Sequence, residues 1–213
     1  MKLENNQIRE EELERVEEAV FVIDMINGFV KFGPLAAPSI MRVVPFQQEI
    51  LEESENKPNS INVFGDDDHG NNAREFLAYG PHANNKEEIK VISELERYKA
   101  SGLEFKKNSV NLMLAPGVIS FLDKLKNLKK VYIMGCLSEV CVSRFTYTIN
   151  EYFDETNRNV DVCVYANGID TYNAPCHNAD EITDDVLKKM ESKKIKVLRR
   201  KINNKGDGIY ENL

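Results

Sequence analysis

Cys141 and the residues around it are the part of this chain whose types and spacing point most directly to chemistry. The run VYIMGCLSEVCVSRFTY, residues 131–147, starts as an apolar β-rich segment, breaks at Gly135, and reaches Cys141 after a polar turn with Ser138 and Glu139. This pattern predicts a strand, a turn and a helix whose first turn carries Cys141, where free backbone N–H groups and the helix dipole favour a thiolate. A thiolate in that position would be the nucleophile of a thiol hydrolase. The competing interpretation is a buried cysteine that packs as a small apolar residue.

Charged residues at the ends of two other strand-like segments could assist this thiol. Asp24 follows the apolar run AVFVI, and a partly desolvated carboxylate there could accept a proton from a thiol and later give it to a leaving amine. Lys106 and Lys107 end the segment LEFKK, and a lysine at such an edge could hold the acid and the thiol together. Each feature also has an ordinary interpretation, in which Asp24 caps the following turn and the lysines are a solvated pair.

A candidate metal site lies in the segment FGDDDHGNNAREFLAYGPH, residues 64–82. Asp67, His69, Glu75 and His82 offer two imidazoles and two carboxylates, a mixed set that suits Zn²⁺, Mn²⁺ or Fe²⁺, with Zn²⁺ the expected ion. Since the set contains no thiolate and open positions are expected, the metal would serve catalysis or substrate binding rather than structure. The alternative is an acidic surface loop that binds nothing.

Alternating strand and helix patterns must bring these residues together. Apolar, β-rich runs predict strands at 19–24, 60–66, 103–107, 131–135, 160–166 and 195–200. Helical spacing of apolar residues predicts helices at 39–54, 87–97, 116–130, 141–153 and 179–193. Within the first of these helices, Pro45 indicates a late start or a break.

The order of these elements predicts an α/β fold with three layers, α/β/α, around a mostly parallel central sheet of about six strands. Right-handed crossovers place the carboxyl ends of parallel strands along one edge, where sites form in open sheets. Asp24, the acidic loop, Lys106, Lys107 and the turn before Cys141 would all lie at this edge. Their convergence predicts an enzyme.

Composition restricts the classes of protein further. The 213 residues carry a net charge of −7, and this negative balance argues against nucleic-acid binding. No apolar run approaches the ~20 residues that cross a membrane. Four cysteines are too few to indicate a disulfide scaffold, which predicts a cytoplasmic protein with reduced thiols. The polar start predicts an acidic N-terminal arm at 1–16, no signal peptide, and a single domain at 17–213.

Four motifs in order give the chain a resemblance to the isochorismatase-like cysteine hydrolases and, within them, to the nicotinamidases. VFVIDMINGFV resembles the first strand and its Asp-x-x-Asn-x-Phe turn, and FGDDDHGNNAREFLAYGPH resembles the metal segment of nicotinamidases. KKNSVN resembles the lysine motif, and IMGCLSEVCV resembles the nucleophile turn, which is the most specific of the four. Two departures are Gly28, where an Asp is common, and Leu112 with Met113 in place of an aromatic residue.

The resemblance implies an isochorismatase-like fold and hydrolysis of a linear amide C–N bond. Cys141, deprotonated by Asp24, would attack the carboxamide carbon of nicotinamide, and Lys107 would stabilise the charged group, with Lys106 as the less favoured register. Backbone N–H groups of Leu137 and Cys141 would form the oxyanion hole, which a cis peptide at Cys136–Leu137 shapes in the family.

The resemblance also implies the ligand set, the substrate contacts and the assembly. A divalent metal on Asp67, His69, Glu75 and His82 would ligate the pyridine nitrogen, and Phe29 would form an aromatic wall for the ring. The activity would belong to NAD salvage, the partner would be a small-molecule amide, and the protein would form a homo-oligomer. Two alternatives are a metal-free relative acting on a carbamoyl or ureido compound and a catalytically silent binding protein.

Overall fold

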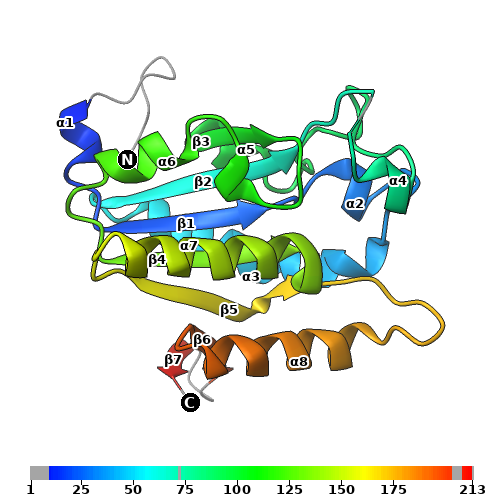
Figure 1. Ribbon diagram of the computed structural model, residues 1–213. Coiled ribbons are helices and arrows are strands. Elements are labelled where there is room, and N and C mark those ends of the chain that lie inside the picture. Colours follow the sequence, from blue (N-terminus) through cyan, green and yellow to red (C-terminus); the bar gives the residue numbers. More distant parts are fainter. Residues whose placement is uncertain (1–9, 72, 203–207, 213) are drawn as a thin grey trace.

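The computed structural model describes residues 10–71, 73–202 and 208–212, and a seven-stranded sheet runs through its centre (Figure 1). The strand order is β3-β2-β1-β4-β5-β6-β7, in which the first six strands are parallel and β7 is antiparallel to β6. The strands are β1 Glu18–Ile23, β2 Ser60–Asp67, β3 Leu103–Lys107, β4 Lys130–Cys136, β5 Asp161–Asp170, β6 Lys196–Ile202 and β7 Gly208–Asn212. The three-layer α/β/α fold is therefore confirmed, with an additional edge strand that the apolar runs did not predict.

Helices cover both faces of the sheet, with α6, α7 and α8 on one face and η1, α3 and α5 on the other. The α-helices are α1 Glu10–Leu13, α2 Asn27–Val30, α3 Val44–Glu55, α4 Phe76–Tyr79, α5 Glu96–Ala100, α6 Val118–Lys124, α7 Ser143–Glu155 and α8 Ala179–Ser192. Two 3₁₀ helices, η1 Pro38–Val43 and η2 Leu112–Leu114, and one π-helical turn, η3 Ser138–Val142, complete the helices of the described residues. Figure 1 shows α2 and α4 at the end of the sheet toward which the β1 and β2 arrows point.

The central strand β1 shows why the sheet is covered on both faces. Ala19, Phe21 and Ile23 pack into the core beneath α6, α7 and α8, whereas Val20 and Val22 pack into the core beneath α3. A strand with apolar residues at every position has no face that favours water, so it takes the centre of a parallel sheet. Asp24 follows this strand directly and is consequently held at the edge of the sheet between β2 and β4.

The predicted helix at 87–97 is wrong, because only Glu96–Ala100 forms a helix in that region. The backbone of the preceding residues bonds to the segment after β1 instead: Asn27 N donates to Lys90 O at 2.8 Å, and Gly28 N donates to Glu88 O at 2.9 Å. Carbonyl groups used in this way are lost to a helix. The predicted helix at 116–130 is shorter than expected, since α6 ends at Lys124.

Pro45 explains the start of the predicted 39–54 helix. A 3₁₀ helix comes first, and α3 begins at Val44 with Pro45 in its first turn, where a missing N–H has no helical partner to lose. Near the N-terminus, Leu13 and Val16 are buried in the core, while residues 1–9 of the expected acidic arm lie outside the described residues. Among the helices that the structure describes, none is long and apolar enough to cross a membrane.

Candidate active site

Asp24 directly follows β1, in a backbone conformation in which its carboxylate contacts the end of β2. Its φ is 54°, in the left-handed region that residues other than glycine rarely adopt. Its backbone N–H donates to Gly65 O at 2.9 Å, and its Oδ1 accepts from Asp67 N at 2.8 Å. Strained residues of this kind occur where surrounding contacts overdetermine the backbone, which is common in active sites.

Lys107, at the end of β3, is the centre of a buried cluster of charges. Its Nζ lies 2.8 Å from Asp24 Oδ2, 2.6 Å from Asp67 Oδ1 and 3.9 Å from Cys141 Sγ. Lys106 points away from this cluster and bonds to Glu104 Oε1 at 2.7 Å. The structure thus separates the two registers that the sequence left open and places Lys107 with the acid and the thiol.

Cys141 lies in the turn that leads from β4 into α7. The Cys136–Leu137 peptide bond before this turn is cis, at the position that the resemblance implied, and η3 carries Cys141 with its side chain buried. Gly135 allows the approach of β4 to β1, because a Cβ on this residue would lie 2.1 Å from Ile23 O, and its φ of 129° also favours glycine. The expected helix at 141–153 begins as this π-helical turn.

Burial dominates the proton affinities in the cluster. Desolvation, together with the charge of Asp67, raises the pKa of Asp24 to about 6, against the opposing effect of Lys107. Desolvation also raises the pKa of the Cys141 thiol well above its ordinary value, and the charges of Asp24 and Asp67 add to this while Lys107 opposes it. The expectation that the helix position would favour a free thiolate is therefore not met. A carboxylate oxygen of Asp24 lies within 4.8 Å of the Cys141 sulfur, so a base stands close to the thiol.

The four residues proposed as metal ligands converge beside this cluster. His69 Nε2 lies 3.5 Å from Asp67 Oδ2 and 3.6 Å from Glu75 Oε1, and His82 Nε2 lies 3.7 Å from Glu75 Oε2. One potential ligand atom from each residue lies within 4.8 Å of the other three. Asp67 therefore belongs to both groups, since its Oδ1 contacts Lys107 and its Oδ2 faces the histidines.

Hydrogen bonds outside the ligand set orient both imidazoles for a cation. His69 Nδ1 donates to Asn108 Oδ1 at 2.8 Å, and His82 Nδ1 donates to Gly80 O at 2.8 Å. A neutral imidazole that donates through Nδ1 has a lone pair on Nε2, which is the arrangement of a metal-bound histidine. His69 Nε2 and Asp67 Oδ2 are buried and have no hydrogen-bond partner among the described residues. These unpartnered atoms fit a divalent cation held by the four side chains.

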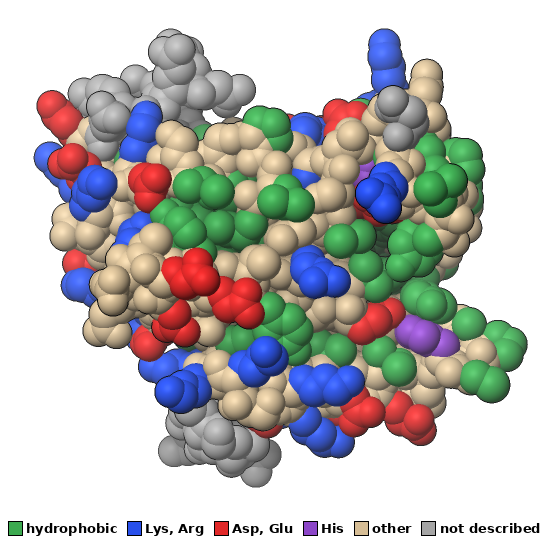
Figure 2. Space-filling model, viewed as in Figure 1, with side chains coloured by type: hydrophobic (Ala, Val, Ile, Leu, Met, Phe, Trp, Pro, Cys, Tyr) green, Lys and Arg blue, Asp and Glu red, His purple; other side chains and the backbone are tan. Residues whose placement is uncertain are grey.

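A mostly apolar pocket joins the thiol to the candidate metal set. Its polar lining comes from Asp67, Glu75, His82 and Cys141, and its other lining residues are Phe29, Leu35, Tyr79, Val110, Leu137 and Val140. The rings of Phe29 and His82 lie 5.7 Å apart between centroids. Figure 2 shows hydrophobic side chains gathered at the end of the molecule that carries α4.

One known family model matches most of the chain. The isochorismatase domain model matches residues 18–192. The chain belongs to the isochorismatase family. The matched range includes all four strands that carry the buried cluster and the turn before α7. A search of curated proteins finds no match.

Solved structures share the fold of this isochorismatase-family protein at low sequence identity. An isochorismatase-like hydrolase from Alkaliphilus metalliredigens has a TM-score of 0.72 and 20% identity over 85% of this chain and 94% of its own. A pyrazinamidase of Pyrococcus horikoshii, in complex with zinc, has a TM-score of 0.68 and 21% identity, covering 86% and 99% of the two chains. An N-carbamoylsarcosine amidase from Thermoplasma acidophilum has a TM-score of 0.65 and 20% identity, covering 83% and 94%.

Some parts of the site of this isochorismatase-family protein escaped the sequence analysis. The double role of Asp67 was missed, because two contacts of one carboxylate depend on where β3 lies. Asn108 was also missed, although its position directly after Lys107 at a strand end was a usable signal. Leu35 in the pocket wall lies outside the four motifs, and Tyr79 and Val110 lie within two of them without an assigned role, because these side chains come together only in the folded chain.

Proposed function

We propose that the protein hydrolyses nicotinamide to nicotinate and ammonia through a thioester on Cys141. The observation that supports this is one pocket whose lining includes the Cys141 thiol together with Asp67, Glu75 and His82. A substrate in this pocket would need a carbonyl group at the sulfur and an electron-pair donor at the opposite end. A flat ring with a ring nitrogen and a carboxamide has both, and the apolar walls suit its faces.

The residues around Cys141 can carry each proton of such a reaction. Asp24 takes the proton of the thiol as the sulfur attacks the carboxamide carbon, and Lys107 balances the charge of the cluster. Backbone N–H groups of Leu137 and Cys141 would stabilise the negative oxygen of the tetrahedral intermediate. When the C–N bond breaks, Asp24 gives its proton to the departing ammonia. It then takes a proton from the water that attacks the thioester, and returns this proton to the sulfur.

The candidate metal set would orient the ring rather than break the bond. Asp67, His69, Glu75 and His82 would hold a divalent cation, which when bound supplies a Lewis acid for the ring nitrogen. Zinc suits two imidazoles and two carboxylates, and the pyrazinamidase neighbour is described in complex with zinc, which supports this choice over Mn²⁺ or Fe²⁺. A cytoplasmic location, a role in NAD salvage and a homo-oligomeric state stay predictions from the sequence.

The alternative substrate is a carbamoyl or ureido compound. The solved structure of an N-carbamoylsarcosine amidase, which has the same fold, is the reason to consider it. A substrate that also carries a carboxylate would favour a cation in the pocket wall. Among the described residues that line the pocket there is no Lys or Arg, and Lys107 is already engaged by Asp24 and Asp67. Without a bound cation, the pocket therefore favours an uncharged amide over one that carries a carboxylate.

Metal analysis of the purified protein, combined with an assay of ammonia release, tests the proposal. We expect about one divalent ion per chain and ammonia release from nicotinamide. Metal without ammonia release would remove this substrate. A metal-free protein that hydrolyses carbamoyl compounds would establish the alternative, and an unreactive Cys141 would indicate a binding protein.

A further inference from the structure

A rigid turn between β5 and α8 carries the third histidine of the chain. Ala174 and His177 exchange two backbone hydrogen bonds of 3.0 and 2.9 Å, and between them Cys176 has a φ of 63°. The His177 ring stacks on Tyr172, with centroids 4.0 Å apart and planes 5° from parallel. The backbone turn and the stacked ring together fix the position of the imidazole.

Both nitrogens of this imidazole face acceptors, and one of them joins the turn to η3. His177 Nδ1 lies 2.9 Å from Tyr172 O, and Nε2 lies 3.1 Å from Glu139 Oε1. The hydroxyl of Thr171 donates to the same Glu139 oxygen at 2.9 Å. Thr171 and His177, both from the segment after β5, thus contact the carboxylate of Glu139 in the turn that carries Cys141.

The partners of Glu139 are themselves anchored. Thr171 is buried, and its backbone N–H donates to Asp170 Oδ1 at 2.8 Å. Arg42 binds both oxygens of Asp170 at 2.7 Å, a bidentate pair that fixes the end of β5. A second link to the same region comes from Ser138 and Thr183, whose hydroxyl oxygens are 3.0 Å apart and buried.

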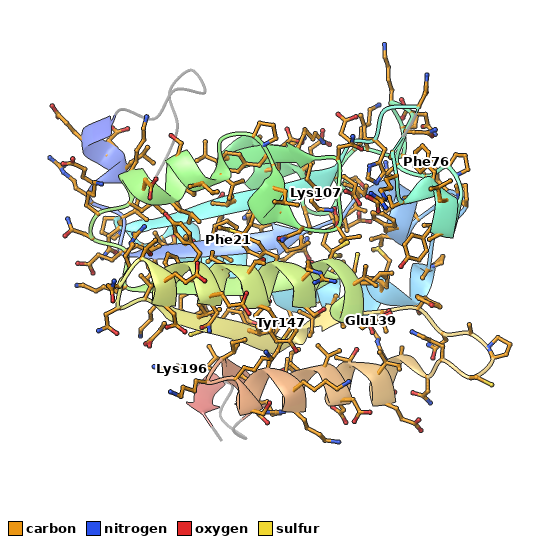
Figure 3. All side chains as sticks on the ribbon, viewed as in Figure 1. Phe21, Phe76, Lys107, Glu139, Tyr147 and Lys196 are labelled. Carbon is orange, nitrogen blue, oxygen red and sulfur yellow. The ribbon has the colours of Figure 1, made fainter. Side chains whose placement is uncertain are left out.

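These contacts hold the turn through side chains outside the lining of the substrate pocket. Glu139 precedes Cys141 by two residues, and its backbone oxygen accepts from Ser143 Oγ at 2.7 Å, so the residue is fixed at both ends. Figure 3 shows Glu139 between the start of α7 and the helix α8. Neither Glu139 nor His177 lines the pocket, so neither would touch a substrate there.

We propose that Glu139 and His177 are positioning residues that set the direction of the Cys141 sulfur and of the backbone N–H groups of the turn. The inference rests on the proposed amide hydrolysis, which needs that direction. We call the contact between Glu139 and His177 the link. If the link is lost, the turn can shift relative to Asp24 while the metal set and Phe29 stay in place. Bond breaking would slow, and binding of the ring would not.

Two variants break the link with little change of shape. Glu139→Gln keeps an oxygen for the Thr171 hydroxyl and removes the charge that faces His177. His177→Phe keeps the stacked ring on Tyr172 and removes both nitrogens. Glu191→Gln is the matched control, because Glu191 of α8 pairs with Arg199 of β6 at 2.7 Å, away from the turn.

We expect each link variant to lower kcat for nicotinamide about three- to tenfold, the net worth of one ordinary hydrogen bond, with KM within twofold of the wild type. The double variant should lose no more than either single variant, because both break the same link. The control should keep its kcat. Unchanged kcat in the link variants, with only a lower Tm, would show a structural role and overturn the inference.

Alkylation of Cys141 by iodoacetamide separates this inference from the proposed function, because it needs no substrate. Peptide mass spectrometry distinguishes Cys141 from the exposed Cys176. We expect the rate at Cys141 to fall at least threefold in both link variants, since the thiol loses its alignment with Asp24, and to stay unchanged in the control. A rate that stays within twofold of the wild type, or rises, would overturn the inference. A wild type without nicotinamide turnover would refute only the proposed function.

Discussion

Replacing Lys107 with methionine should destabilise the fold far more than replacing its neighbour Lys106. The ammonium of Lys107 is buried and contacts Asp24 at 2.8 Å and Asp67 at 2.6 Å, so Lys107→Met leaves two buried carboxylates without their shared cation. Removal of one partner from a buried ion pair costs about 3–5 kcal/mol in the free energy of unfolding. This is a large part of the ~5–15 kcal/mol that stabilises a typical domain.

Lys106→Met is the control for the same change of side chain one residue away. Lys106 is about one-third exposed and bonds to Glu104 at 2.7 Å, and such pairs are worth about 1 kcal/mol or less. Urea unfolding followed by circular dichroism gives both free energies. A Lys107→Met protein within ~1 kcal/mol of the Lys106→Met protein would refute the ionised cluster. Amide hydrolysis should fall at least ~100-fold in Lys107→Met and little in Lys106→Met.

Three further predictions concern the thiol, the metal set and the junction of the central strands. Cys141→Ala should abolish ammonia release while the metal content measured by mass spectrometry is unchanged, and retained activity would exclude the thioester. His69→Ala should chiefly raise KM, because the metal positions the ring; steady-state kinetics with unchanged KM and reduced kcat would contradict this. Gly135→Ala should lower the free energy of unfolding by ~3 kcal/mol or more, since its Cβ would lie 2.1 Å from Ile23 O. A urea midpoint equal to that of the wild type would show that β1 and β4 can move apart to make room for the methyl group.

The strands could be predicted because a central parallel strand has an unusual composition. Residues 19–23 are apolar throughout, and such a run can be buried on both faces only within a covered sheet. The failed helix at 87–97 shows the limit of this approach. Its apolar spacing suits a helix, but tertiary bonds from Asn27 and Gly28 take its carbonyl groups, and a pattern within one segment does not show them.

The site could be assembled from sequence because its residues stand at strand ends. The resemblance favoured Lys107 over Lys106, and the register of β3 on β2, which pairs Asp67 with Lys107, gives the physical reason. The proton affinity of Cys141 could not be read from its helix position, since burial is the largest cause that raises the pKa of the thiol. Depth in the fold depends on the helices that cover the sheet, which a local motif does not specify.

The pairing of β1 with β4 has a consequence for how the chain reaches this state. Cys136 and Asp24, which meet across this junction, are 112 residues apart in the chain. During synthesis β1, β2 and β3 are all made before β4. Until β4 is made, the side of β1 that pairs with it is an unpaired edge, to which another chain could bind. Contacts between such distant residues form slowly. We therefore expect aggregation during refolding to increase steeply with protein concentration, and a peptide copy of 130–136 to compete for the open edge.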